Sequence, residues 1–283
     1  MNDYKIRPMT RADLDLAVAW AAAEGWNPGL HDAEAFFATD PEGFLIGELD
    51  GAPVSCVSAV RYPENFAFLG FYIVRPAHRG KGLGIAIWKA AMRRLEGYNI
   101  GLDGVLDQQA NYRRSGFVFQ YSNARFAGLG GGALLPDLPA LGLTRVEELD
   151  PAALAAFDRA HFAVARAAFL SHWLQQPAGA ALAKLEDGEI AGYGVIRACR
   201  QGHKIGPLFA KDIRVADALF TGLRATVAGA EIFLDVPLVN PAALALAESH
   251  GLTQVFETAR MYTRGDPGLP HARIFGVTSF ELG

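Results

Sequence analysis

The sequence lacks the features that mark a secreted or membrane protein. It has two cysteines, Cys56 and Cys199, which is too few for a disulfide framework and fits buried, inert thiols in a reducing cytoplasm. No apolar run approaches the roughly 20 residues of a membrane span, and charged residues interrupt the N-terminus where a signal peptide needs an apolar core. We therefore expect a cytoplasmic protein with no membrane partner.

Basic charge and metal-ligand patterns are also scarce. Lysine and arginine total 26 against 30 acidic residues, a net charge of −4, so the sequence offers no surplus to bind nucleic acid. The seven histidines form no His-x-x-x-His or His-x-His pattern, and no Cys-x-x-Cys occurs, which predicts no metal site. In contrast, 51% of the 283 residues are hydrophobic, enough to build about two globular domains.

One stretch divides the chain by composition. Glycine and proline crowd together over residues 128–142, where no helical or strand periodicity survives. We interpret these residues as a linker between a domain at 1–127 and a second domain at 143–283.

The two halves show the same order of signals. Asp-Gly hairpin turns at 50–51 and 187–188 are 187 − 50 = 137 residues apart, and the pairs at 116–117 and 251–252 are 251 − 116 = 135 apart. Two near-equal offsets favour an internal duplication. Each half begins with a short strand and a capped helix, and the predicted caps are Thr10, for a helix through Glu24, and Asp150, followed by Pro151.

A glycine-rich loop is the most informative motif. An apolar strand over 66–75 ends at Pro76, and Arg79-Gly-Lys-Gly-Leu-Gly84 then leads into a helix. Bare amides at a helix N-terminus form an anion site, and glycine lets a phosphate approach the backbone. A Walker loop requires Ser or Thr after the lysine, and a dinucleotide loop requires Gly or Ala three residues after its second glycine. Neither requirement is met.

The pattern that remains, Val-x-Pro-x-x-Arg-Gly-x-Gly-x-Gly over Val74 to Gly84, resembles the pyrophosphate loop of the GNAT acyltransferases. Phrases at 24–29, 100–104, 260–262 and 275–283 look like a bacterial subgroup with two GNAT units and a C-terminal acetyltransferase-like domain. The resemblance implies an α+β fold: a tandem GNAT fold of two mixed, mostly antiparallel sheets flanked by helices, with the second copy degenerate.

The resemblance also implies an N-acyltransferase that uses acetyl-CoA or another acyl-CoA as co-substrate. Tyr112, four residues before Gly116, stands where these enzymes carry a tyrosine that protonates the departing thiolate. The amide near Val74 would polarise the thioester carbonyl. The CoA-binding residues that it implies are Ile73, Val74, Arg79, Gly80, Lys81, Gly82, Leu83 and Gly84.

Two features that the resemblance leads us to expect are missing from the sequence. The strand over 66–75 has no carboxylate to serve as general base, which leaves Glu64, His203 or a water as candidates. The second half has Ala247 in place of a tyrosine and no glycine over 211–214, so we expect one acyl-CoA site per chain.

The acceptor is expected to be a small-molecule amine held between the halves of a monomer or homodimer. A regulatory protein that binds acyl-CoA without catalysis is the alternative, and a purely structural module is a third reading. The candidate acceptor residues are Trp26, Asn27, His31 and Phe36 from the first half, and Asp158, His161 and Arg166 from the second.

Overall fold

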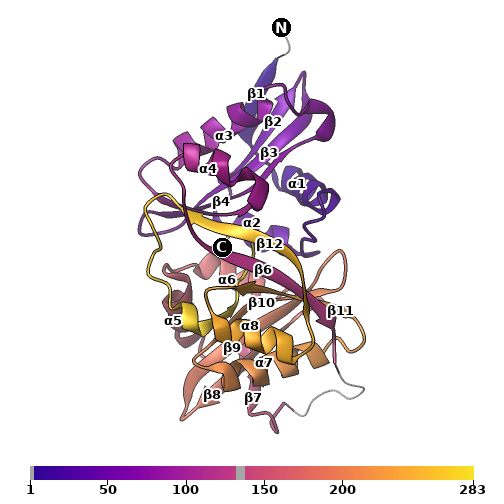
Figure 1. Ribbon diagram of the computed structural model, residues 1–283, viewed down its shortest axis with the longest axis vertical. Coiled ribbons are helices and arrows are strands. Elements are labelled where there is room, and N and C mark those ends of the chain that lie inside the picture. Colours follow the sequence, from indigo (N-terminus) through magenta and orange to yellow (C-terminus); the bar gives the residue numbers. More distant parts are fainter. Residues whose placement is uncertain (1–2, 132–137) are drawn as a thin grey trace.

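The computed structural model describes residues 3–131 and 138–283, and the two halves of the chain repeat one order of helices and strands (Figure 1). The first half contains β1 (Tyr4–Pro8), α1 (Arg11–Ala23), α2 (Asp32–Thr39), β2 (Phe44–Leu49), β3 (Ala52–Arg61), β4 (Phe66–Val74), α3 (Leu83–Arg94), β5 (Asn99–Val105), α4 (Gln109–Arg114) and β6 (Val118–Leu129). The second half contains β7 (Leu143–Arg145), α5 (Pro151–Phe162), α6 (Ala167–Trp173), β8 (Ala180–Glu186), β9 (Glu189–Ala198), β10 (His203–Ala210), α7 (Ile213–Ala225), β11 (Glu231–Pro237), α8 (Pro241–Ser249), β12 (Thr253–Tyr262) and β13 (Ile274–Gly276).

Local sequence signals start and stop these elements largely as predicted. Thr10 caps α1 in a capping box with Asp13, and the helix ends at Ala23, one residue earlier than expected. Asp150 caps α5, which has Pro151 as its first residue. Both Asp-Gly turns carry positive φ at both residues, the backbone of a two-residue hairpin that follows the twist of its strands.

The strands form one continuous sheet in the order β1-β2-β3-β4-β5-β12-β6-β11-β10-β9-β8-β7, and β13 pairs with β10. Only β4–β5 and β10–β11 pair in parallel among the described strands. The tandem, mostly antiparallel fold is therefore confirmed, with the difference that the two expected sheets are joined.

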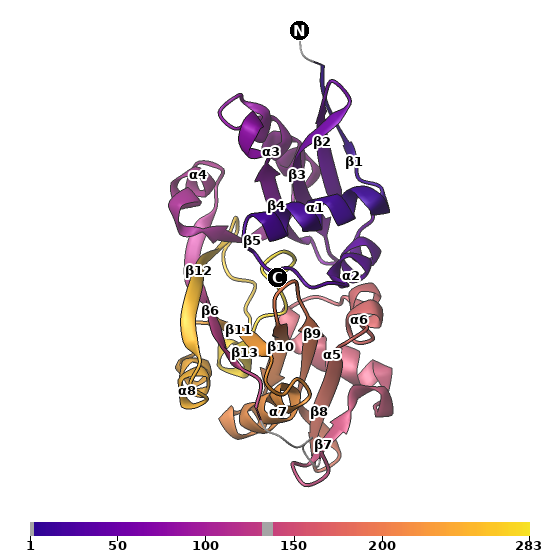
Figure 2. The ribbon, with the colours of Figure 1, turned by 90° about the vertical axis from the view of Figure 1, so that its right-hand side faces the viewer.

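The sheets of the two halves are joined because the halves exchange strands β6 and β12. β12 of the second half pairs with β5 of the first, β6 of the first pairs with β11 of the second, and β6 pairs with β12. The two exchanged strands lie side by side in both views (Figures 1 and 2). Strand β6 runs to Leu129, so it crosses the predicted boundary at 127–128. Residues 132–137 of the predicted linker lie outside the described residues.

The hydrophobic core also crosses between the halves. Helix α3 packs on the first-half strands, whereas α1 and α2 share a cluster with α5 and α6. Phe36 of α2 stacks on Trp173 of α6 at 6.0 Å between ring centroids and meets Phe71 of β4 edge-on at 5.8 Å. Phe36, expected on the acceptor side, is thus a fully buried core residue.

Both cysteines are buried and free, as predicted. The Cys56 thiol lies against the carbonyl oxygen of Phe71 at 3.1 Å. Burial raises the pKa of both thiols, so little reactive thiolate forms at neutral pH. Over residues 3–131 and 138–283, no helix is long and apolar enough to cross a membrane.

Candidate active site

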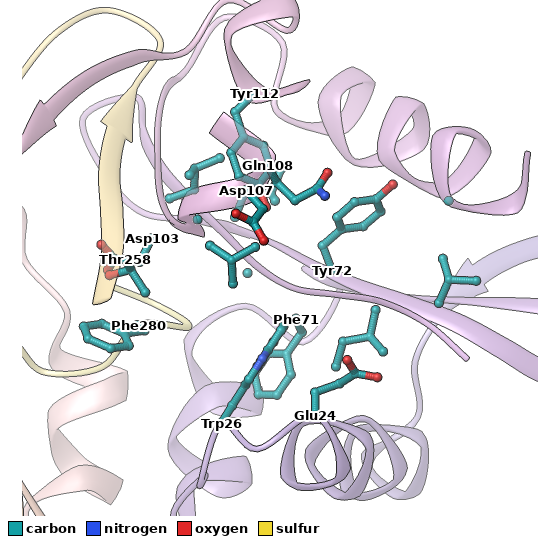
Figure 3. A pocket seen from close by; sticks show the side chains of 18 of the residues that line it. Glu24, Trp26, Phe71, Tyr72, Asp103, Asp107, Gln108, Tyr112, Thr258 and Phe280 are labelled. Atoms are coloured by element: carbon teal, nitrogen blue, oxygen red, sulfur yellow. The ribbon is translucent and has the colours of Figure 1, made fainter. Parts of the chain in front are cut away.

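The site begins where two parallel strands separate. β4 and β5 pair from Phe66 with Asn99 to Leu69 with Leu102, and no strand pairs with the β5-facing edge of β4 over the described residues beyond that point. A cavity of about 760 Å³ opens there, with Tyr112 and Tyr72 on its walls (Figure 3). The unpaired backbone edge of β4 can accept an extended ligand as an additional strand.

A bulge in β4 lies at the same place. The register between β3 and β4 shifts between Cys56 and Ser58, and Phe71 has φ +47°. A bulge leaves one residue out of the ladder and redirects the peptide groups beside it. A bulky residue at positive φ is uncommon, and such strain concentrates at functional sites.

The glycine loop forms the second wall. Gly82 is the N-cap of α3 with φ +81°, and no side chain caps this helix, so its first amides are free for an anion. Gly80 also has positive φ. Gly84 has little space for a side chain, because a Cβ there would lie 2.8 Å from the Tyr72 hydroxyl and would displace the Tyr72 ring.

The charged residues of the loop are held by the backbone. Arg79 donates from Nε to the Val74 carbonyl at 2.8 Å and pairs with Glu24, whereas Lys81 donates to the Ala77 carbonyl at 2.9 Å. Of the predicted CoA-binding residues, Ile73, Val74, Arg79, Gly80, Gly82 and Gly84 line the cavity. Lys81 and Leu83 lie in the loop and are not among the described residues that line the cavity.

Tyr112 reaches the cavity from α4. It is 9% exposed, and its ring packs on Trp88 with centroids 5.6 Å apart. Gly104 of β5 makes room for it, because a Cβ at Gly104 would lie 2.2 Å from the Tyr112 ring. Burial, with a smaller effect of Tyr72, raises the pKa of Tyr112 to about 12. The phenol therefore keeps its proton across the neutral range.

Both halves of the chain build the far side of the cavity. Trp26 lines it, and the Trp26 carbonyl accepts a hydrogen bond from Arg125 Nη1 at 2.8 Å. Phe256, Thr258, Phe280 and Glu281 complete this side. Phe280 and Thr258 lie on the opposite side of the cavity from Tyr72 (Figure 3). Trp26 thus lines a cavity to which both halves contribute, and its role toward the acceptor stays a prediction.

Two other candidate acceptor residues have structural partners instead. The Asn27 side chain makes two hydrogen bonds with the backbone of Gln201, each 2.9 Å long. Arg166 makes a buried bidentate pair with Asp158, at 2.8 and 2.7 Å, and donates to Thr278 at 3.0 Å. Neither Asn27 nor Arg166 is among the described residues that line the cavity.

The remaining candidates also lie apart from the cavity. His31 is the N-cap of α2, and His161 stacks between Phe157 and Phe209. Glu64 forms an exposed ion pair with Arg159, and His203 begins β10. None of these four is among the described lining residues, and no described group of three potential metal ligands occurs.

The sequence matches known acyltransferases over both halves. Residues 12–117 match the Acetyltransferase (GNAT) family, and residues 154–276 match an Acetyltransferase (GNAT) domain. The holothin acyltransferase of Pseudoalteromonas sp. (strain SANK 73390) is 31% identical over 279 residues, which cover 98% of this chain and 94% of the relative. The chain belongs to the GNAT acyltransferase family. It is an acyl-transferring enzyme with two GNAT units.

Solved structures show the same tandem fold. A Pyrococcus horikoshii protein assigned as an acetyltransferase has a TM-score of 0.83 at 21% identity, covering 99% of this chain and 96% of its own. A tandem GNAT protein from the clavulanic acid biosynthesis pathway has a TM-score of 0.62 at 14% identity, covering 94% and 99%. The predicted resemblance to tandem GNAT proteins is confirmed.

The second GNAT unit has the same helix and strands without the same opening. Asp212 caps α7 by accepting from the amides of Arg214 and Val215, both at 3.0 Å. β10 and β11 pair only from His203 to Ile205, and β13 then pairs with β10. A carboxylate and a strand of the chain itself occupy the places that are free in the first unit.

Two parts of the cavity were not predicted from the sequence. Arg125 lies in no motif of the sequence, and Glu281 lies in the 275–283 stretch, for which no site role was expected; the two residues are 281 − 125 = 156 positions apart. The strand exchange and the path of the C-terminal segment bring them together.

Proposed function

We propose that this GNAT enzyme transfers an acetyl group from acetyl-CoA to a primary amine of a small molecule by direct attack. The observation that carries the proposal is one cavity that joins an uncapped helix N-terminus, an unpaired strand edge and a buried tyrosine. The CoA diphosphate would bind the amides at Gly80 to Gly84, and pantetheine would pair with β4 beyond Leu69.

The chemistry follows from this placement. The amine nitrogen attacks the thioester carbonyl carbon, whose oxygen is stabilised by backbone amides near Val74. The C–N bond forms, the nitrogen loses a proton to solvent, the C–S bond breaks, and the leaving sulfur takes a proton from the Tyr112 phenol, which solvent restores. No covalent enzyme intermediate is needed, in keeping with two buried cysteines that lie outside the cavity lining.

The acceptor would enter from the side between the units. Residues 1–127 then supply Tyr112 and the CoA-binding loop, and the second unit contributes Phe256, Thr258, Phe280 and Glu281 to the acceptor site. Holothin is a first acceptor to test, because a holothin acyltransferase is similar over nearly the whole chain. The buried free thiols fit a reducing cytoplasm, where we expect a monomer or homodimer that binds neither nucleic acid nor membrane.

Mass spectrometry of holothin and a panel of primary amines incubated with acetyl-CoA tests the proposal. We expect an acetylated product, and a kcat lower by about 10²–10⁴-fold in Tyr112→Phe at unchanged CoA affinity. Tyr98→Phe is the matched control, because Tyr98 is outside the cavity lining and its ring packs under Arg61.

The other outcomes separate the alternatives. Tight CoA binding with no product across the panel would favour the regulatory protein. A protein whose melting temperature does not respond to CoA would fit neither an enzyme nor a sensor.

A further inference from the structure

The C-terminal segment carries a carboxylate into the cavity. Glu281 lines the cavity and is 4% exposed, and its Oε2 is buried with no hydrogen-bond partner in the structure. A buried carboxylate oxygen without a partner is costly, so this oxygen calls for a partner from outside the chain, which a bound ligand can supply.

The structure fixes Glu281 beside the point where β4 and β5 separate. The Glu281 carbonyl would lie 2.3 Å from a Cβ on Gly70, the first β4 residue after the parallel pairing ends. Its neighbours are tied down on both sides. Phe280 packs under the Arg125 guanidinium at 5.0 Å, and the Leu282 carbonyl accepts from the Tyr62 hydroxyl at 3.0 Å.

Buried charges of both signs surround this carboxylate. Arg125, Arg197 and Lys204, from β6, β9 and β10, each interact electrostatically with Glu281. Asp235 and Asp32 pair with Arg125 and Arg197, at 2.6 and 2.8 Å. Three cations thus face three carboxylates, and Glu281 is the one of the three that forms no ion pair within the described residues. Its Oε2 is therefore left without a bonded cation within the described residues.

We propose that Glu281 is the general base that takes a proton from the ammonium group of the acceptor. This inference rests on the proposed amine acylation. The N–H bond of the ammonium breaks, the proton moves to the Glu281 carboxylate, and the freed lone pair attacks the thioester carbon. The Glu281 proton then leaves to solvent. As the adduct collapses, the nitrogen loses its second proton to solvent, the C–S bond breaks, and the thiolate takes a proton from Tyr112, which solvent restores. Glu281 thereby fills the role for which strand β4 carries no carboxylate.

The test compares Glu281→Gln with wild type on two kinds of amine. The probes are phenethylamine, an ammonium ion at neutral pH, and aniline, which is neutral there, alongside the most active amines of the panel. For ammonium substrates we expect kcat to fall about 10²–10⁴-fold, with recovery as the pH rises and free amine accumulates. Aniline turnover should fall much less. Glu281→Asp should keep part of the activity, and Glu248→Gln, on the exposed surface of α8, serves as the charge-matched control.

Several results would overturn the assignment. Equal losses for ammonium and neutral amines, an increase in amine KM alone, or unchanged kcat would each exclude a proton-accepting role. A Glu281→Gln protein that unfolds or loses CoA affinity while Glu281→Asp behaves like wild type would assign the carboxylate to structure. If wild type acetylates no amine, the proposed function itself fails, a result distinct from active wild type with an active Gln variant.

Discussion

The two GNAT units differ most where each parallel strand pair opens. In the first unit the space between β4 and β5 is a cavity, and α3 begins with glycine and no side-chain cap. In the second unit β13 pairs along β10, and Asp212 caps α7. An internal strand thus stands where a pantetheine arm would pair, and an internal carboxylate stands where a phosphate would bind. The fold is shared, and we expect the copy with free backbone groups at its opening to be the one that binds a ligand.

One segment of the chain, residues 277–281, lies against both openings. A Cβ on Gly206 of β10 would lie 2.5 Å from the Val277 carbonyl, and one on Gly70 of β4 would lie 2.3 Å from that of Glu281. The two glycines are 206 − 70 = 136 residues apart, between the offsets of the other duplicated pairs. The segment therefore crosses both copies at equivalent positions. It closes the second opening and brings a carboxylate to the first.

The largest effect should come from separating the units. A fragment of residues 1–127 lacks β12, the strand that pairs with β5, and the segment that crosses Gly70. We expect it to be unfolded or aggregated and to show no CoA binding, because the β5 edge and a large apolar surface are exposed. Circular dichroism and calorimetry check this. A soluble, CoA-binding fragment would mean that β6 replaces β12 beside β5 and that the units are independent.

The next test makes the first opening resemble the second. Gly82→Asp places a carboxylate at the N-cap of α3, as Asp212 does for α7, and we expect CoA affinity to fall by about 100-fold, or about 2.7 kcal/mol. Gly82→Asn is the matched control, because Asn and Asp both tolerate the left-handed φ of +81°. Isothermal titration calorimetry measures the CoA affinity of the two variants. Equal affinities for the two variants would place the diphosphate elsewhere.

A smaller effect should distinguish Gly70 from Gly206, the two glycines against which the C-terminal segment packs. Gly70→Ala and Gly206→Ala each force a Cβ against a backbone carbonyl, and we expect each to lower the free energy of unfolding by about 1–3 kcal/mol. Only Gly70→Ala displaces the backbone of Glu281 directly, so its kcat should fall further than that of Gly206→Ala. Urea denaturation measures the free energy of unfolding of both variants, and steady-state kinetics measure their kcat. Matching kcat values would remove the link between the Gly70 crossing and turnover.

Local signals made much of the fold predictable. The capping box at Thr10, the Asp-Gly turns and the glycine loop each depend on residues within a few positions of one another, and the structure has all three. Repetition of these signals in each half predicted the duplication. The absence of glycine over 211–214 predicts that no phosphate cradle forms there, and this stays a prediction; Asp212 as the cap of α7 was not foreseen.

Long-range contacts were not predictable in the same way. The strand exchange does not change the hydrophobic pattern of β6 or β12, because either partner buries the same face. Glu281 reads as a polar residue near the chain end until the crossing at Gly70 is known. Arg166 reads as a ligand for an anion, yet Asp158, eight residues away, satisfies it. The partners of buried charges could therefore be identified only from the tertiary structure.

The smallest expected effect tests whether the second unit is closed for good. Asp212→Ala removes the α7 cap and should lower the free energy of unfolding by about 0.5–2 kcal/mol, while CoA stoichiometry stays at one per chain. The hydrogen bond from the Val215 amide lowers the pKa of Asp212. Its stabilising contribution is therefore present above the unfolded-state pKa of about 3.9 and is lost as the pH falls through the folded-state value. Urea denaturation at neutral and acidic pH should show the gap between wild type and variant closing in acid. Because β13 still pairs with β10 in the variant, freeing the amides of α7 is not sufficient for binding; a second bound CoA would show that the aspartate alone had kept the second copy empty.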